Sequence, residues 1–138
     1  MAENLEADKA TLFFDGVCNL CNRTVDFLIR HDRNGELRYA SLQGETARTA
    51  VPEFVQEQGL GTVVLVDRDG KHVRSTAIGR SLRIVGGFWG MLGSLLLLIP
   101  RPIRDAAYRW VARNRFRWFG RRDSCRLPTP EERLLFLP

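Results

Sequence analysis

The sequence predicts an α/β protein with a four-stranded mixed sheet, flanked by helices and followed by a helical C-terminal extension. Three observations lead to this fold class. Short apolar, β-favouring runs alternate along the chain with segments of helical periodicity. The length of 138 residues suits one domain. A strong turn signal at residues 67–70 (DRDG) separates two strand-like runs, which predicts one antiparallel pair.

The first 42 residues contain a predicted βαβ unit. Residues 11–14 (TLFF) are short and apolar, and they end at Asp15-Gly16. A helix is expected from residue 18, because one face collects the residues at helical spacing: Cys18, Cys21, Val25 and Leu28. Residues 37–42 (LRYASL) alternate between apolar and polar and predict a second, parallel strand reached by a right-handed crossover.

The middle of the chain predicts the rest of the sheet. Residues 43–58 are polar with sparse apolar positions, which indicates a surface helix broken near Pro52. Residues 62–66 are a continuous apolar run, typical of a buried strand. After the turn at residues 67–70, residues 71–74 are expected to return antiparallel. The resulting order, β-α-β-α-β-β-α, is that of the thioredoxin-like fold.

Two further helices follow. Ser75 or Thr76 is the expected N-cap of the first, and Gly86-Gly87 is expected to end it. Its predicted buried stripe consists of Ile78, Ser81, Leu82 and Val85. The second begins near Pro102, and its predicted apolar face consists of Ile103, Ala106, Ala107, Trp110, Val111 and Asn114. Arg104, Arg109 and Arg113 lie off that face.

Between these helices, residues 88–99 (FWGMLGSLLLLI) form an apolar run of 12 residues. A membrane-spanning helix needs about 20, so a core or interfacial element is expected instead. Residues 129–132 (TPEE) combine an N-cap, a first-turn proline and a glutamate, and predict a short terminal helix. We interpret residues 1–10 as a loose N-terminal arm without a signal-like stretch, and residues 11–138 as one domain whose basic helical extension starts at about residue 100.

The chemistry is expected at two of the three cysteines, Cys18 and Cys21. A helix N-terminus presents unpaired N–H groups and partial positive charge, and these lower a thiol pKa from about 8.5 toward 3.5–7.5. Cys18, nearest the tip, is the predicted nucleophile, and Cys21, one turn further in, is the predicted resolving thiol. The odd cysteine count argues against a secreted disulfide scaffold, so a cytoplasmic protein is expected.

Two alternatives for the cysteine pair involve no redox chemistry. The cysteines could be packing residues, since cysteine is often buried. They could also form half of a zinc site, but zinc needs about four ligands. The remaining candidates, Cys125, His31 and His72, are scattered along the sequence. No metal and no cofactor are therefore expected.

Asp15 lies three residues before Cys18 and allows two interpretations. It could be a buried carboxylate that accepts a proton from a cysteine, while its negative charge opposes thiolate formation. It could equally be a turn or helix-capping aspartate, which requires no catalysis.

Residues 14–21 (FDGVCNLC) resemble the DCC family of thiol–disulfide oxidoreductases, which is named for its Asp-x-x-Cys-x-x-Cys signature. The likeness continues through residues 39–43 (YASLQ), 62–67, 108–120 and 125–128. The resemblance implies a thioredoxin-like fold, a redox-active pair at Cys18 and Cys21, and a role for Asp15. The chain departs from true thioredoxins, because Asn19-Leu20 replaces the proline-containing pair and no proline precedes the strand at residues 62–66.

Residues 101–126 carry nine arginines against two aspartates, interleaved with five aromatic residues. This pattern could bind nucleic acid, or lie on an anionic membrane with the leucines of residues 95–98 inserted. The favoured interpretation is a helix that packs its aromatics on the sheet and solvates its arginines.

The leading functional hypothesis is a thiol–disulfide oxidoreductase whose partner is a protein or small-molecule disulfide or thiol. The alternative is a non-catalytic adaptor that binds a protein or anionic membrane through the arginine-rich helix. Nucleic acid is disfavoured as a partner, and the sequence predicts no particular oligomeric state.

Overall fold

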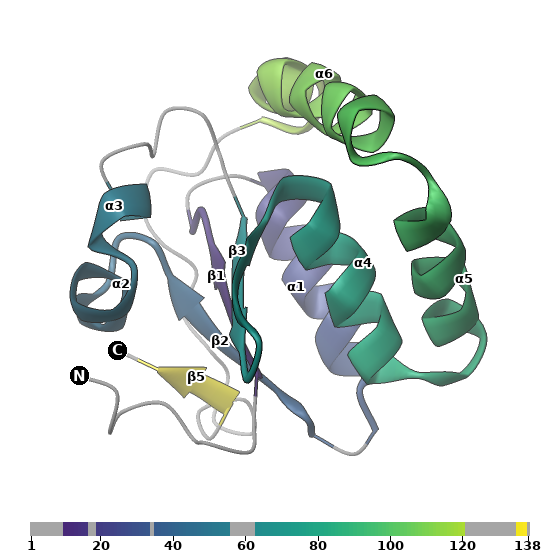
Figure 1. Cartoon of the computed structure of the whole chain (residues 1–138). Helices are drawn as coiled ribbons and strands as arrows, with labels where there is room; N and C mark the ends of the chain where they lie inside the picture. The colour runs from purple at the N-terminus through teal and green to yellow at the C-terminus, as the bar shows by residue number, and fades with distance from the viewer. Residues whose placement is uncertain (1–9, 17–18, 34, 56–62, 121–134, 138) are drawn as a thin grey trace.

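The computed structural model describes residues 10–16, 19–33, 35–55, 63–120 and 135–137. Its centre is a mixed sheet with the strand order β4-β3-β1-β2-β5 (Figure 1). The strands are β1 (Ala10–Phe14), β2 (Leu37–Ser41), β3 (Val64–Asp67), β4 (Gly70–Val73) and β5 (Phe136–Leu137). β1 pairs in parallel with β2 and antiparallel with β3, and β4 returns antiparallel on β3. The predicted four-stranded mixed sheet is confirmed, and the two-residue β5 extends it at the β2 edge.

Helices cover both faces of the sheet. α2 (Glu45–Ala50) and α3 (Pro52–Val55) lie on one face, separated at Pro52 as the sequence predicts. α1 (Asn19–His31) and α4 (Arg74–Val85) lie on the other, with α5 (Gly87–Leu98) outside α4 and α6 (Arg101–Phe119) across their ends (Figure 1). β1 supplies both cores by strand alternation: Leu12 and Phe14 face α1, and Phe13 faces α2.

The described part of the predicted α1 face is confirmed. Cys21, Val25 and Leu28 are buried against the sheet, whereas Cys18 lies outside the described residues. The residues of the predicted N-terminal arm before Ala10 and of the predicted terminal helix at 129–134 also lie outside them.

The predicted start of α4 is wrong. Arg74, expected at the end of a strand, begins the helix, and Val73 is its N-cap without a side-chain hydrogen bond. The hydroxyls of Ser75 and Thr76 turn toward α6 instead, where the Arg104 Nη1 donates to them at 3.0 and 2.7 Å. Ser75 Oγ in turn donates to Asp105. These hydroxyls therefore bind the half-buried side chains of Arg104 and Asp105 and do not cap the helix. A polar group removed from water needs a hydrogen-bond partner.

α4 is buried through its small residues. The predicted stripe is fully buried at Ser81, and its other members, Ile78, Leu82 and Val85, are half-buried and pack against the core. The fully buried positions are Ser75, Ala77, Gly79 and Ser81. The small residues allow α5 to approach closely, with Gly93 of α5 against Gly79 of α4.

The predicted buried face of α6 is correct only at Val111 and Asn114, which are half-buried. Ile103 and Trp110 are 64% and 56% exposed, whereas Arg104 and Tyr108 are half-buried and turn inward. α6 crosses above the ends of α1 and α4 rather than resting on the sheet (Figure 1). Polar contacts of Arg104 and Tyr108, and not hydrophobicity alone, therefore determine which side of α6 faces the rest of the protein. Among the described residues, no helix is both long and apolar enough to cross a membrane.

Candidate functional site

The described part of the candidate site lies where β1 ends and α1 begins. Asp15 directly follows β1 and is 2% exposed, and Cys21 lies in the first turn of α1 and is 7% exposed. Cys18, the predicted nucleophile, and Cys125 lie outside the described residues. The fold therefore brings a buried carboxylate and a buried cysteine to the same strand–helix junction.

The side chain of Gln43 holds Asp15. Its Nε2 donates to Asp15 Oδ1 at 2.9 Å, and its Oε1 accepts from the Gly16 amide at 3.0 Å and from Ser41 Oγ at 2.5 Å. The two donors on Oε1 fix the orientation of the amide, so that its NH₂ group must point to the carboxylate. Sequence reasoning did not select Gln43. Gln43 could have been selected from its position just after β2. Neighbouring parallel strands such as β1 and β2 end at the same edge of the sheet, which brings the residues that follow them together.

Asn22 anchors the same loop from the helix side. This buried side chain donates from Nδ2 to the Gly16 carbonyl at 2.9 Å. Gln43 and Asn22 thus engage the N–H and the C=O of Gly16, the last described residue before Cys18. Gly16 is therefore held through both of its backbone polar groups.

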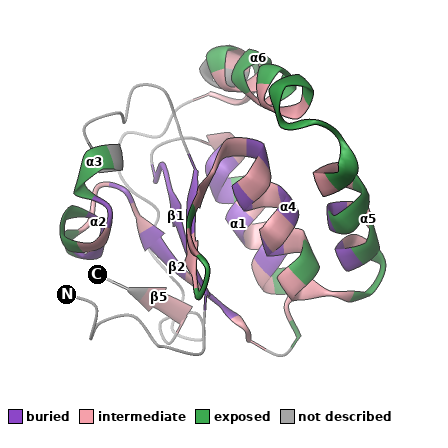
Figure 2. Cartoon of the chain, in the orientation of Figure 1, coloured by how far each residue is buried: buried purple, intermediate pink, exposed green. Residues whose placement is uncertain are grey.

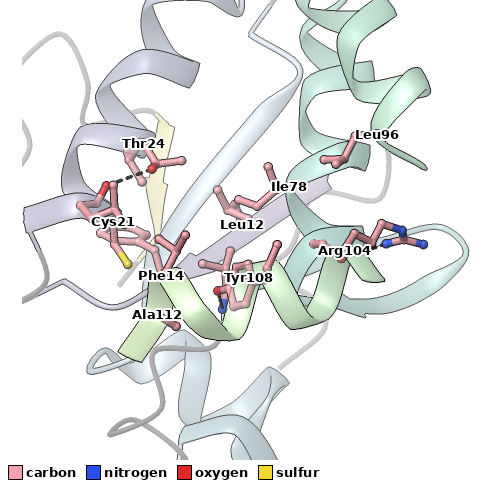
Figure 3. A pocket seen from close by; sticks show the side chains of 15 residues that line it. Leu12, Phe14, Cys21, Thr24, Ile78, Leu96, Arg104, Tyr108 and Ala112 are labelled. Atoms are coloured by element: carbon pink, nitrogen blue, oxygen red, sulfur yellow. Dashed lines mark hydrogen bonds between the residues drawn. The ribbon is translucent and has the colours of Figure 1, made fainter. Parts of the chain in front are cut away.

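A largely apolar cavity of about 310 Å³ opens beside Cys21. Its lining comes from the sheet, α1, α4, α5 and α6. Figure 3 shows Cys21 near Phe14 and Ala112 at one end, and Arg104 with Leu96 at the other. The polar groups of the wall are engaged internally: Thr24 Oγ1 donates to the Leu20 carbonyl, and the Tyr108 hydroxyl accepts from the Val63 amide at 3.0 Å. The wall therefore offers mainly apolar surface around the Cys21 side chain.

The C-terminal end of α6 binds the first residue of α1. Asn19 donates from Nδ2 to the Phe119 carbonyl at 2.8 Å, and its backbone N–H points to the Gly120 carbonyl at 3.4 Å. Arg23 adds a cation–π contact, 5.8 Å from the Phe119 ring centroid. The carbonyl end of one helix thus meets the N–H end of the other, which pairs opposite ends of their dipoles. The basic helix is tied directly to the segment between the two cysteines, and sequence reasoning missed this link.

The two histidines considered as metal ligands have other partners. His31 Nδ1 lies 2.8 Å from the Phe27 carbonyl, and His72 Nε2 lies 3.0 Å from Asp67 Oδ1. Asp67 also accepts from Arg80 Nε at 3.0 Å. Burial alone would raise the pKa of Asp67, but the hydrogen bonds from His72 and Arg80 outweigh it and lower that pKa below its usual value. Within the described ranges, no three His, Cys, Asp or Glu side chains cluster as a metal site would require.

Comparison with known proteins gives one family and two curated relatives. The family described as DCC1-like thiol-disulfide oxidoreductase matches residues 12–121. "Uncharacterized protein YuxK" of Bacillus subtilis is 37% identical over 132 residues, which cover 92% of this chain and 93% of that protein. "DCC family protein At1g52590, chloroplastic" of Arabidopsis thaliana is 36% identical over 123 residues, which cover 88% and 72%. No solved structure matches the chain.

Proposed function

Because this chain belongs to the DCC1-like thiol-disulfide oxidoreductase family, we propose that it exchanges a disulfide between its Cys18–Cys21 pair and a protein or small-molecule partner. Family membership supports a thiol–disulfide redox role in general. The observation that carries the specific proposal is that Cys21, in the first turn of α1, and Asp15, which follows β1, are both buried at the same strand–helix junction.

The proposed reaction has two exchange steps. The Cys18 thiolate attacks a substrate disulfide, so that a mixed disulfide forms and one substrate thiolate leaves and takes a proton. Cys21 then loses its proton and attacks the Cys18 sulfur. This step forms the Cys18–Cys21 disulfide and releases the second substrate thiol. The substrate gains two electrons and the protein loses two, so a dithiol reductant must reduce the pair before the next turnover.

The burial of Cys21 supports this division of roles. A substrate disulfide cannot readily reach a side chain that is 7% exposed, so the first attack is assigned to the other cysteine of the pair, Cys18. The apolar cavity wall around Cys21 also disfavours a standing negative charge on its sulfur. The Cys21 thiol therefore needs a base that accepts its proton when it attacks the Cys18 sulfur.

Asp15 is the proposed proton acceptor for that step. Its carboxylate is buried, and the Gln43 amide holds one of its oxygens. We also propose that the protein works in the cytoplasm, where a reducing environment keeps a catalytic dithiol available.

Insulin reduction by dithiothreitol tests the proposed function. The wild-type protein should accelerate the reaction, and Cys18→Ser should abolish the acceleration. Cys125→Ser is the matched control, because it removes a cysteine outside the proposed pair and should leave turnover unchanged. Equal acceleration by wild type and Cys18→Ser would refute the role of Cys18. The absence of acceleration by the wild-type protein would refute the redox proposal and favour the non-catalytic adaptor, for which the exposed side chains of α5 and α6 are the supporting observation.

A further inference from the structure

The large apolar side chains that stand most exposed in the described residues all lie on α5, α6 and the turn between them. In Figure 2, much of the ribbon of both helices is coloured as exposed. Its members are Phe88, Met91, Leu95, Leu98, Ile99, Ile103, Trp110 and Trp118. Single exposed apolar residues are ordinary, but eight of them gathered on two successive helices and the turn between them indicate an interaction surface. We call these eight residues the outer apolar face.

α5 presents its smallest residues inward and its largest outward. Gly90 and Gly93 are its buried residues and pack on α4. Phe88, Met91, Leu95 and Leu98 recur at spacings of three and four on the opposite side, and Leu98 is 79% exposed. The 12-residue helix contains no charged side chain. A helix that only served the core would bury its large residues and expose polar ones, so the outer side of α5 suits an apolar surrounding.

α6 supplies positive charge and tryptophan beside this apolar stripe. Arg101, Arg109, Arg113 and Arg117 are exposed. The one acidic residue of the helix, Asp105, is half-buried and engaged by Ser75. Trp110 and Trp118 are both exposed, with their ring centroids 5.1 Å apart. Tryptophan favours the boundary between lipid chains and headgroups, and arginine favours anionic headgroups.

Independently of the redox proposal, we propose that α5 and α6 bind the surface of an anionic lipid bilayer. α5 inserts the side chains of the outer apolar face among the headgroups and upper acyl chains, and the four exposed arginines contact lipid phosphates. Because α5 is far shorter than the roughly 20 residues of a spanning helix, it lies in the interface.

The other partners fit this surface less well. A symmetric dimer would place the same face on both sides of the contact and bring the arginines of two α6 helices together. Nucleic acid would bind the arginines through its phosphates, but it would leave the aliphatic side chains of α5 in water. A surface that is both apolar and anionic can contact the apolar side chains of α5 and the arginines of α6 at the same time.

Vesicle sedimentation with the full chain tests the proposal. Vesicles of phosphatidylcholine with about one-third phosphatidylglycerol should bind the protein, and pure phosphatidylcholine should bind it much more weakly. Raising the salt from about 0.1 M to about 0.5 M should weaken the anionic binding, because the arginine contacts are screened. Tryptophan fluorescence should shift to the blue on binding, since Trp110 and Trp118 leave water.

Two double variants separate the apolar and electrostatic contributions. Leu95→Gln with Leu98→Gln should weaken binding by about tenfold or more per leucine. Arg109→Gln with Arg113→Gln should weaken it by about fivefold per arginine, or roughly 25-fold together. The matched control is Arg48→Gln with Arg68→Gln, which removes the same charge from exposed positions on α2 and the β3–β4 turn and should change binding much less.

Three outcomes would overturn the proposal. The first is the absence of binding to anionic vesicles at low salt by a folded wild-type protein. The second is equal weakening by the α6 arginine pair and the control pair, which would reduce the effect to net charge. The third is a wild-type dimer in sedimentation velocity that the leucine variant converts to monomer, which would make the face a self-interface. Insulin reduction is measured separately, so loss of vesicle binding with retained turnover rejects this inference alone.

Discussion

The close approach of α4 and α5 makes Gly93→Ala a sharp test of the packing. A methyl group on Gly93 would lie 2.6 Å from the Gly79 carbonyl oxygen, 2.7 Å from Leu82 Cβ and 3.1 Å from the Arg83 nitrogen. Two of these atoms belong to the α4 backbone, so relief requires α5 to move outward. Gly90→Ala is the matched control on the same helix, because its nearest neighbours, the carbonyl oxygens of Leu82 and Arg83, lie at 3.6 Å.

The two variants should change stability in opposite directions. Alanine is favoured over glycine within a helix by about 1 kcal/mol, and Gly90→Ala should gain up to that amount. Overpacking costs about 1–3 kcal/mol, so Gly93→Ala should lose a net amount of up to about 2 kcal/mol after the helix gain is subtracted. Because the helix gain is common to both variants, their free energies of unfolding should differ by roughly 1–3 kcal/mol, which corresponds to a Tm difference of about 3–12 °C at this chain length.

Thermal unfolding followed by circular dichroism measures this difference directly. Equal melting temperatures for Gly93→Ala and Gly90→Ala would refute the close contact of α5 with α4. They would also remove the reason for α5 to turn its large side chains outward.

Three further predictions concern the site and its surroundings. Asn19→Ala should cost about 1 kcal/mol and speed amide hydrogen exchange at the end of α6, whereas Asn114→Ala, whose side chain bonds only within α6, should not change exchange near Asn19. Asp67→Asn should cost about 1 kcal/mol at pH 7. Because the pKa of Asp67 is lowered in the folded protein, its contribution is present above about pH 4 and is lost as the pH falls through the folded value, so denaturation midpoints of the two proteins should converge in acid. Asp15→Asn should speed the first thiol attack and slow resolution in single-turnover kinetics; unchanged resolution with a large drop in Tm would instead make Asp15 a structural cap.

The sequence predicts the parts of the fold that local patterns determine. The βαβ unit, the break at Pro52 and the turn before Gly70 follow from periodicity, proline and glycine, and each lies where predicted. The strand–helix junction that positions Asp15 and Cys21 follows from the same patterns. Membership in the DCC family was recognisable from the motif at residues 14–21.

The features that the sequence did not predict depend on contacts between distant segments. Arg104 is turned inward by Ser75 and Thr76, which belong to another helix, so helical periodicity alone did not predict which residues of α6 face inward at its N-terminal half. Gln43 became visible as a site residue only once the ends of β1 and β2 lay side by side. The contact of Asn19 with Phe119 joins residues a hundred positions apart and leaves no local signal.

The most direct test of the redox proposal is to trap its intermediate. In a Cys125→Ser background, Cys21→Ser protein treated with the symmetric disulfide of 5-thio-2-nitrobenzoate should release one equivalent of thiolate and stop as a stable mixed disulfide that peptide mapping assigns to Cys18. The Cys125→Ser protein that keeps both Cys18 and Cys21 should release two equivalents and form the Cys18–Cys21 disulfide. If that protein also stops at one equivalent, or if its label remains on Cys21, the proposed roles of Cys18 and Cys21 are contradicted.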